Sequence, residues 1–197
     1  MWNSMKRKRS VRNRRARRCL FLILLALLAL LLIWPRMVHL EGLVSPYAIL
    51  VDADSGGAVA EKEADVSIYP ASMTKVMTAL LALEANPDLE QPVTLPEDIF
   101  PELRAEGASM AGFQPGETAT VRDLLYGALL PSGAECCEAL AREVSGSEEA
   151  FVELMNQKAA ELGMRSTHFC NPTGLHDPEH VSTVRDMARL LRAAMQN

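Results

Sequence analysis

Cysteine is scarce in this sequence of 197 residues, and metal-ligand patterns are missing. The four cysteines are too few for the disulfide framework of a secreted domain, although Cys170 is a possible partner for Cys136 or Cys137. No spacing of Cys and His side chains matches a metal site. The sequence therefore predicts no metal and no other cofactor.

Acidic residues are absent from the first forty positions. Residues 1–18 carry nine Lys or Arg, whereas all 25 acids lie from Glu41 onward, against ten Lys or Arg, a net charge of 10 − 25 = −15. A basic head can bind nucleic acid, but here Cys19 to Trp34 follow with no polar side chain beyond the cysteine. Because basic residues before an apolar run orient a chain with its N-terminus inside, we expect a membrane segment and no nucleic-acid partner.

The apolar run is short for a membrane span, which needs roughly 17 to 25 residues, and a little long for the core of a signal peptide. No small-x-small cleavage site follows it, which favours an uncleaved anchor over a signal peptide. The predicted organisation is a cytoplasmic head at 1–18, an anchor or signal peptide at 19–35, a linker at 36–46 and an extracytoplasmic domain at 47–197. The protein is then bound to the cell membrane, or secreted if the segment is cleaved.

Short strands and several helices are predicted in the rest of the chain. The stretches 47–54 and 58–62 read as a β-hairpin around a Ser-Gly-Gly turn, and 92–95 and 109–113 read as short strands. Capping residues and apolar periodicity predict the helices. These helices cover residues 72–86, 121–130, 133–144, 147–163 and 184–195.

A serine and a lysine open the most apolar of these helices. Ser72 and Lys75 are three residues apart, so their side chains share one helix face, and the run VMTALLAL that follows is typical of a buried helix. A lysine that accepts a proton at neutral pH needs a pKa lowered from about 10.4 to roughly 7 to 8, which burial can supply. The pair therefore predicts a serine nucleophile with a lysine base, against the alternative that Ser72 only caps the helix.

A second serine lies on a turn between two predicted helices, in Leu130-Pro131-Ser132-Gly133-Ala134. Such a turn can present the Ser132 hydroxyl to a cleft, although serine beside proline and glycine is also ordinary turn chemistry.

Together these motifs resemble the penicillin-recognising serine enzymes, which carry SxxK and then a second serine motif. The likeness is greatest to the D-alanyl-D-alanine carboxypeptidases, the low-molecular-mass penicillin-binding proteins. It rests on YPASMTKVMTALLALE, GETATVRDLLYGALLPSG, GSEEAFVELMNQKAAELGM and THFCNPTGLHDPEHVSTVRDM. It implies an α+β, β-lactamase/transpeptidase-like fold, a helical subdomain with an antiparallel sheet. Within the last stretch, we expect Asn171 and His180 to hold a loop together.

The resemblance implies a role for each candidate residue. Ser72 would attack the carbonyl between two terminal D-alanines and form an acyl-enzyme, Lys75 would take its proton, and Ser132 would relay a proton to the leaving D-alanine. The implied partners are peptidoglycan pentapeptides ending in D-Ala-D-Ala, β-lactam inhibitors and the membrane.

The sequence departs from the family pattern twice. The second motif is normally Ser-x-Asn, and here Ala134 replaces the asparagine, with no evident substitute in Glu135. Losing one positioned polar contact can cost on the order of 10² to 10³ in rate. The third motif, Lys-Thr/Ser-Gly on a downstream strand, does not occur. We therefore expect an incomplete sheet, the N-terminal part of a carboxypeptidase domain, and weak or no acylation by these residues alone.

Two other functions fit part of the pattern. A class A β-lactamase would need a deacylating glutamate about 35 residues after Ser132, but residues 165–169 hold no acid. A non-catalytic, membrane-anchored wall-binding protein is favoured by Ala134 and the missing third motif, whereas the Ser72–Lys75 pair argues against it.

Overall fold

The computed structural model describes residues 25, 40 and 42–197. The predicted basic head, the apolar segment and part of the linker lie outside the described residues, apart from Leu25. The chain divides into two compact units, Met1–Val38 and His39–Asn197, and everything below concerns the second. No helix among the described residues is both long and apolar enough to cross a membrane.

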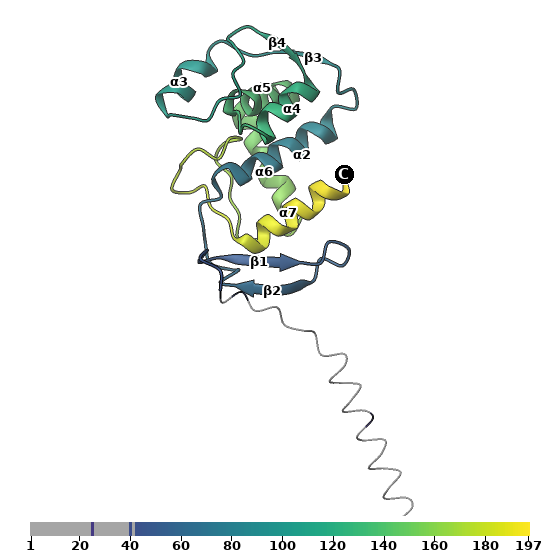
Figure 1. The fold of residues 1–197 in the computed structure, drawn as a ribbon. Coiled ribbons are helices and arrows are strands. Elements are labelled where there is room, and N and C mark those ends of the chain that lie inside the picture. Colours follow the sequence, from purple (N-terminus) through teal and green to yellow (C-terminus); the bar gives the residue numbers. More distant parts are fainter. Residues whose placement is uncertain (1–24, 26–39, 41) are drawn as a thin grey trace, which may run out of the picture. The chain divides into compact units, whose positions relative to one another are not determined.

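The second unit combines two small sheets with six α-helices among its described residues (Figure 1). Strands β1 and β2 form one antiparallel pair and strands β3 and β4 form another. In chain order the elements are β1 (Ala48–Val51), β2 (Ala58–Lys62), the 3-10 helix η1 (Ala71–Thr74), α2 (Lys75–Ala85), β3 (Pro92–Thr94), α3 (Ile99–Ala105), β4 (Thr118–Thr120), α4 (Val121–Leu129), α5 (Ala134–Ser145), α6 (Glu148–Glu161) and α7 (Val184–Gln196).

Side-chain caps set the starts of three helices where the sequence predicts them. Thr120 and Asp123 form a complete capping box at α4. Ser147 accepts a hydrogen bond from a backbone N–H in the first turn of α6, and Thr183 does the same at α7. Because each cap satisfies an N–H that the helix itself cannot, these three boundaries follow from local sequence.

Helix α2 lies between the other helices and contributes to both hydrophobic cores (Figure 1). Ala79 and Ala82 belong to the core formed with β3, α3, β4, α4 and α5. Met77 and Leu80 belong to the core formed with α5, α6 and α7. The apolar character of α2 on every side, visible in the sequence, therefore reflects burial on two faces.

In the segment between α2 and α4, one helix was missed and one predicted strand was wrong. Helix α3 was not predicted. Its Pro101 stands in the first turn, where the N–H that proline lacks would have no intrahelical acceptor. Residues 109–113 form no strand. The backbone N–H groups of Ala111 and Gly112 instead donate to the buried carboxylate of Glu135 at 2.7 and 2.8 Å, a long-range partner that replaces a strand ladder.

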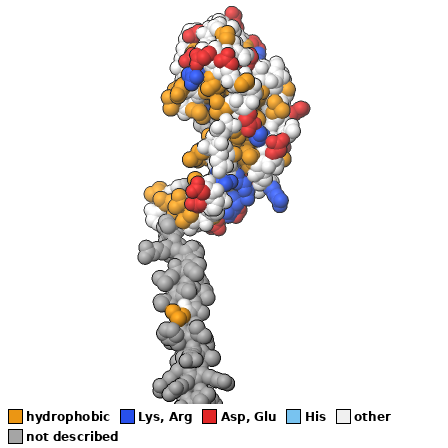
Figure 2. All heavy atoms as spheres, turned by 90° about the vertical axis from the view of Figure 1, so that its right-hand side faces the viewer, with side chains coloured by type: hydrophobic (Ala, Val, Ile, Leu, Met, Phe, Trp, Pro, Cys, Tyr) orange, Lys and Arg blue, Asp and Glu red, His pale blue; other side chains and the backbone are white. Residues whose placement is uncertain are grey.

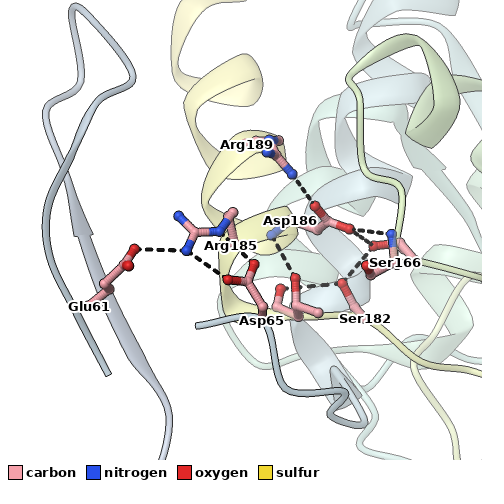
Figure 3. Close-up of polar contacts among 9 residues, drawn as sticks. Glu61, Asp65, Ser166, Ser182, Arg185, Asp186 and Arg189 are labelled. Atoms are coloured by element: carbon pink, nitrogen blue, oxygen red, sulfur yellow. Dashed lines mark hydrogen bonds and ion pairs between the residues drawn. The ribbon is translucent and has the colours of Figure 1, made fainter. Parts of the chain in front are cut away.

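Polar contacts at the start of α7 join it to the β1–β2 hairpin and to the chain before it (Figure 3). Arg185 donates to Glu61 of β2 and, with two nitrogens, to Asp65. The buried Asp186 accepts from the Ser166 backbone N–H at 2.9 Å. Figure 2 shows a gathering of Lys and Arg side chains low on the face that it draws, and acidic side chains above it.

Candidate active site

Ser72 and Lys75 lie in contact at the start of α2. Ser72 is exposed and sits in the 3-10 helix η1, and Lys75 is the first residue of α2, with 5% of its surface exposed. The Lys75 Nζ and Ser72 Oγ atoms are 3.3 Å apart. The sequence predicted one continuous helix here, but a 3-10 turn eclipses residues three apart and so brings the same two side chains together.

Ser132 reaches the same hydroxyl from a distant part of the chain. It lies between α4 and α5 with a left-handed φ of 66°, and its Oγ donates to Ser72 Oγ at 2.9 Å across 60 residues of sequence. Gly133 is needed beside it, because a Cβ there would lie 2.6 Å from the Cβ of Ala111 and 2.9 Å from the carbonyl oxygen of Gly127. The structure thus brings all three predicted site residues together.

Lys75 has a second partner that the sequence did not predict. Its Nζ donates to the backbone carbonyl of Thr173 at 2.6 Å, across 98 residues of sequence. One helical turn further along α2, Thr78 Oγ1 donates to the carbonyl of Pro172 at 2.6 Å. The segment before α7 is therefore fixed along α2 by its main chain, and one of its carbonyls orients the lysine.

Asn171 and Gly174 hold this segment in place. The Asn171 Oδ1 atom accepts from the backbone N–H groups of Thr173 and Gly174 at 3.2 and 2.7 Å. Gly174 has φ 79° and lies so close to η1 that an added Cβ would collide with the carbonyl oxygen of Ala71. The expected loop-holding role of Asn171 agrees with these contacts.

His180 contacts η1 through the side chain of Thr74. It is buried, its Nδ1 accepts from the Cys170 backbone N–H at 3.1 Å, and its Nε2 lies 2.8 Å from Thr74 Oγ1. Because Nδ1 accepts, the neutral ring carries its proton on Nε2 and donates it to Thr74. Burial lowers the pKa of His180 to about 4, so the ring stays neutral at physiological pH. Its expected structural role agrees with this geometry.

Burial lowers the pKa of Lys75, which is the direction that a lysine base requires. The nearby Cys137 and Glu135 oppose this effect. Burial also raises the pKa of Cys137 to about 12, so its thiol is uncharged at neutral pH. Glu135 is therefore the charge that favours the ammonium form of Lys75.

Glu135 also organises the surroundings of the Ser132 turn. It is fully buried, one oxygen accepts the two N–H groups of Ala111 and Gly112, and the other has no hydrogen-bond partner among the described residues. Ala134 donates its N–H to the Ser109 carbonyl at 2.8 Å. The carboxylate at position 135 thus binds the 109–112 backbone that packs against Gly133.

The three cysteines in the described part of the chain are free, so none of the disulfides left open by the sequence forms there. The same residues contain no group of His, Cys, Asp or Glu side chains arranged to hold a metal ion.

Chemically, the arrangement is an exposed hydroxyl that contacts a buried amine and a second hydroxyl. Loss of one proton from Lys75 turns the 3.3 Å contact into one in which Ser72 donates to nitrogen. Sequence reasoning identified the three side chains, because each belongs to a short motif. It missed the Thr173 carbonyl, for which the Asn-Pro-Thr-Gly run was the available signal, and the contacts of Glu135.

Comparisons with known proteins show the family of this chain. The family described as "D-alanyl-D-alanine carboxypeptidase" matches residues 37–197. The chain is similar to D-alanyl-D-alanine carboxypeptidase DacF of Bacillus subtilis, with 38% identity over 76% of this chain and 38% of the relative. It is also similar to D-alanyl-D-alanine carboxypeptidase DacC of Escherichia coli, with 41% identity over 76% of this chain and 39% of the relative. The chain thus spans about two fifths of the length of these relatives.

Solved structures show the same fold. The Streptomyces K15 DD-transpeptidase superposes with a TM-score of 0.76 at 31% identity, over 81% of this chain and 64% of that one. Penicillin binding protein 6B from Escherichia coli superposes with a TM-score of 0.76 at 29% identity, over 82% of this chain and 53% of that one. The predicted transpeptidase-like α+β fold is therefore confirmed for the described residues.

Proposed function

This chain belongs to the D-alanyl-D-alanine carboxypeptidase family, and from that premise we propose that the protein is a serine-type D-Ala-D-Ala carboxypeptidase. Its proposed substrates are peptidoglycan pentapeptides ending in D-Ala-D-Ala, from which it removes the last D-alanine, and β-lactams would acylate the same serine. The single observation that carries the proposal is that Ser72 Oγ contacts both Lys75 Nζ and Ser132 Oγ, at 3.3 and 2.9 Å.

In the proposed reaction, Ser72 Oγ attacks the carbonyl carbon of the bond between the two D-alanines as Lys75 takes the hydroxyl proton. Collapse of the tetrahedral intermediate breaks the C–N bond. Ser132 then relays a proton from Lys75 to the nitrogen of the departing D-alanine. Water attacks the remaining ester, returns Ser72 to its hydroxyl form and releases the shortened peptide.

Ala134 bears on the rate of this reaction. It supplies no side-chain amide where the family pattern has one, and the Glu135 carboxylate beside it is buried and engaged with the 109–112 backbone. We therefore propose that substrate recognition at this position relies on other groups. The alternative function is that of a non-catalytic wall-binding protein, and the experiment below distinguishes it from a carboxypeptidase.

We further propose that residues 19–35 anchor the protein in a bacterial cell membrane, with 1–18 in the cytoplasm and 47–197 outside. This rests on the order of charge and hydropathy in the sequence. Peptidoglycan lies on that outer side, where the proposed substrate would meet Ser72.

The experiment is D-alanine release from a diacetyl-Lys-D-Ala-D-Ala peptide by the longest natural form of the protein that contains these residues. A peptide ending in D-Ala-L-Ala is the stereochemical control. Incubation with a fluorescent penicillin, followed by mass spectrometry, identifies the acylated residue. The matched variants are Ser72→Ala, Lys75→Ala and, as an exposed control on α6, Glu153→Gln.

We expect release from the D-Ala-D-Ala peptide only and penicillin attached to Ser72. Ser72→Ala is expected to abolish both, and Lys75→Ala to slow acylation by about 10² to 10⁴, the usual contribution of a general base. Peptide binding without D-alanine release, with no label on Ser72, would favour the wall-binding protein instead.

A further inference from the structure

A cavity of about 300 Å³ is lined in part by Asn171 and Thr173, in the segment that contacts Lys75. Thr173 belongs to both sites, because it lines this cavity and its carbonyl accepts from Lys75. The other walls come from α3, α5, the first turn of α6 and the chain up to Asp177. The cavity's volume lies at the lower end of the range for small-molecule sites.

The cavity is lined by six carboxyl groups and one guanidinium. The acids come from four separate parts of the chain, so no single helix accounts for them. They are Asp98, Glu102, Glu106, Glu138, Glu148 and Asp177. Such a concentration of one sign of charge in a concave site raises the local concentration of cations.

Among these acids, Glu138 is the one whose surroundings indicate a ligand. Only 6% of its surface is exposed, it lines the cavity, and its Oε2 has no hydrogen-bond partner among the described residues. Its natural partner is Arg142, four residues further along α5, but Arg142 donates instead to both oxygens of Asp98, at 3.0 and 2.8 Å. A buried carboxyl without a partner is costly, and a bound cation would remove that cost.

The shape and lining of the cavity indicate the kind of cation. No three acids of the described residues converge as the ligands of a bare metal ion would. Ile99, Leu103 and Leu175 add an apolar wall beside the carboxyl groups. The methylene groups of an aliphatic cation would pack against this wall, and carboxylates that lie apart would each pair with a separate ammonium group of the same ligand.

We propose that this cavity binds an aliphatic chain that carries primary ammonium groups, with Glu138 as the buried anion that receives one of them. The chemistry is shared by free diamines and by the aminoalkyl side chains of peptides. The proposal is independent of the proposed catalytic function, because it concerns binding alone.

The charges around Glu138 make this binding depend on pH. Burial, together with Glu148 on α6, Glu102 on α3 and Asp98 before α3, raises the pKa of Glu138 to about 8, although Arg142 opposes the shift. The other titratable groups that line the cavity are Glu106, Cys170, His176 and Asp177. An empty cavity thus holds a protonated Glu138 at pH 7, which must lose its proton as the ammonium binds.

The test is isothermal titration of the full chain with 1,5-diaminopentane at pH 8.5 and pH 6.5 and constant ionic strength. Parallel titrations use n-pentylamine, an acetyl-Gly-Lys-Gly-amide peptide and MgCl₂. Buffers of different ionisation enthalpy measure the protons released. Variants are Glu138→Gln, Glu102→Gln as an exposed wall position, and Glu153→Gln as the control outside the cavity.

We expect saturable binding of 1,5-diaminopentane at pH 8.5 and roughly tenfold weaker binding at pH 6.5. Proton release on binding should be greater at pH 6.5, because Glu138 is then almost entirely protonated before the ligand binds. Glu138→Gln is expected to weaken binding about tenfold to a hundredfold and to remove the pH dependence, since it loses a buried charge-assisted contact. Glu102→Gln is expected to weaken binding only a few-fold, about two to five times, as an exposed charge, and Glu153→Gln to leave it unchanged.

Binding of the diamine but not the peptide identifies a free diamine as the ligand, and the converse identifies a peptide side chain; either supports the proposal. No saturable binding of diamine or peptide at pH 8.5 would overturn it. So would equal binding by MgCl₂, which would indicate a hydrated metal ion, or unchanged binding in a folded Glu138→Gln variant.

Discussion

At the scale of single residues, the charge state of Lys75 depends on a balance between burial and Glu135. Burial favours the neutral amine and the carboxylate favours the ammonium. Glu135 also binds the Ala111 and Gly112 N–H groups, so a residue without a side-chain acceptor there would unfold the loop as well as remove the charge. A glutamine separates the two effects, because its amide oxygen still accepts while its charge is zero.

We predict that Glu135→Gln shifts the acid limb of the acylation profile to lower pH. The reason is that removing the carboxylate lowers the pKa of Lys75 further, so the neutral amine persists into more acidic solution. The measurement is the second-order rate of penicillin acylation from pH 5 to pH 10. Glu153→Gln, an exposed change of the same kind, should leave the profile where it is, and an unmoved midpoint in a folded Glu135→Gln protein would contradict the role of this charge.

His180 predicts how stability depends on pH. The ordinary histidine pKa of 6.5 falls to about 4 in the folded protein because of burial, so the unfolded chain binds more protons between these values. The contribution to stability is therefore complete above pH 6.5 and is lost as the pH falls towards 4, by roughly 3 kcal/mol in total.

A His180→Gln variant tests this prediction by urea unfolding at pH 7.5, 6, 5 and 4. The variant should be less stable than the natural protein at pH 7.5, and the difference between them should shrink steadily towards pH 4. His176→Gln is the control, because His176 is an exposed histidine in the same segment. A difference that stays constant with pH would show that His180 does not titrate as its burial requires.

At the scale of elements, the geometry of the candidate active site depends on how closely the 171–174 loop approaches η1. Gly174 leaves no room for a Cβ against the Ala71 carbonyl, and Ala71 itself has a left-handed φ of 49°. Ser72 follows Ala71 directly. Its hydroxyl is therefore positioned both by the close approach of Gly174 to Ala71 and by the contact with Lys75. Strain of this kind persists only where surrounding contacts determine it.

We predict that Gly174→Ala destabilises the protein by about 3 kcal/mol or more and reduces acylation of Ser72, since the clash adds to the ordinary cost of a left-handed alanine. Gly146→Ala is the matched control, because Gly146 has a similar φ of 83° but nothing within 4 Å of an added Cβ. It should cost only about 1 to 2 kcal/mol. Equal effects of the two changes on stability and acylation would refute the close-approach argument.

The elements divide into those that local sequence determines and those that it does not. Helices α4, α6 and α7 were predictable because each is capped by Thr120, Ser147 or Thr183 through the residue three positions further on. Residues 109–113 were not, because their backbone partner is Glu135, more than twenty positions downstream. The same holds in the site: side chains were identifiable from motifs, but the carbonyl that orients Lys75 comes from a fold contact.

At the scale of the whole unit, α2 makes the two hydrophobic cores depend on each other. Leu124 of α4 lies in one core and Phe151 of α6 in the other, both fully buried. If either core separated from α2, the helix would lose part of its burial, and the packing of the other core against α2 would weaken. We therefore expect residues 39–197 to unfold as one cooperative unit.

The prediction is that Leu124→Ala lowers the unfolding free energy by about 2 to 5 kcal/mol and Phe151→Ala by about 3 to 5 kcal/mol, each with a single transition. Urea unfolding followed by circular dichroism, with hydrogen exchange on peptides from α4 and α6, measures both cores at once. Leu191→Ala, at a position 51% exposed on α7, should change stability by less than about 0.5 kcal/mol. Separate transitions for the two peptides would contradict the coupling.

The acceptor that orients Lys75 is a main-chain oxygen, not a side chain. A substitution of Thr173 therefore keeps a main-chain oxygen at this position. A rotation of the peptide plane, in contrast, would remove the hydrogen bond that orients the Lys75 amine, without changing any sequence motif. A comparison of amino-acid identities alone would therefore miss one of the groups on which the proposed catalysis depends.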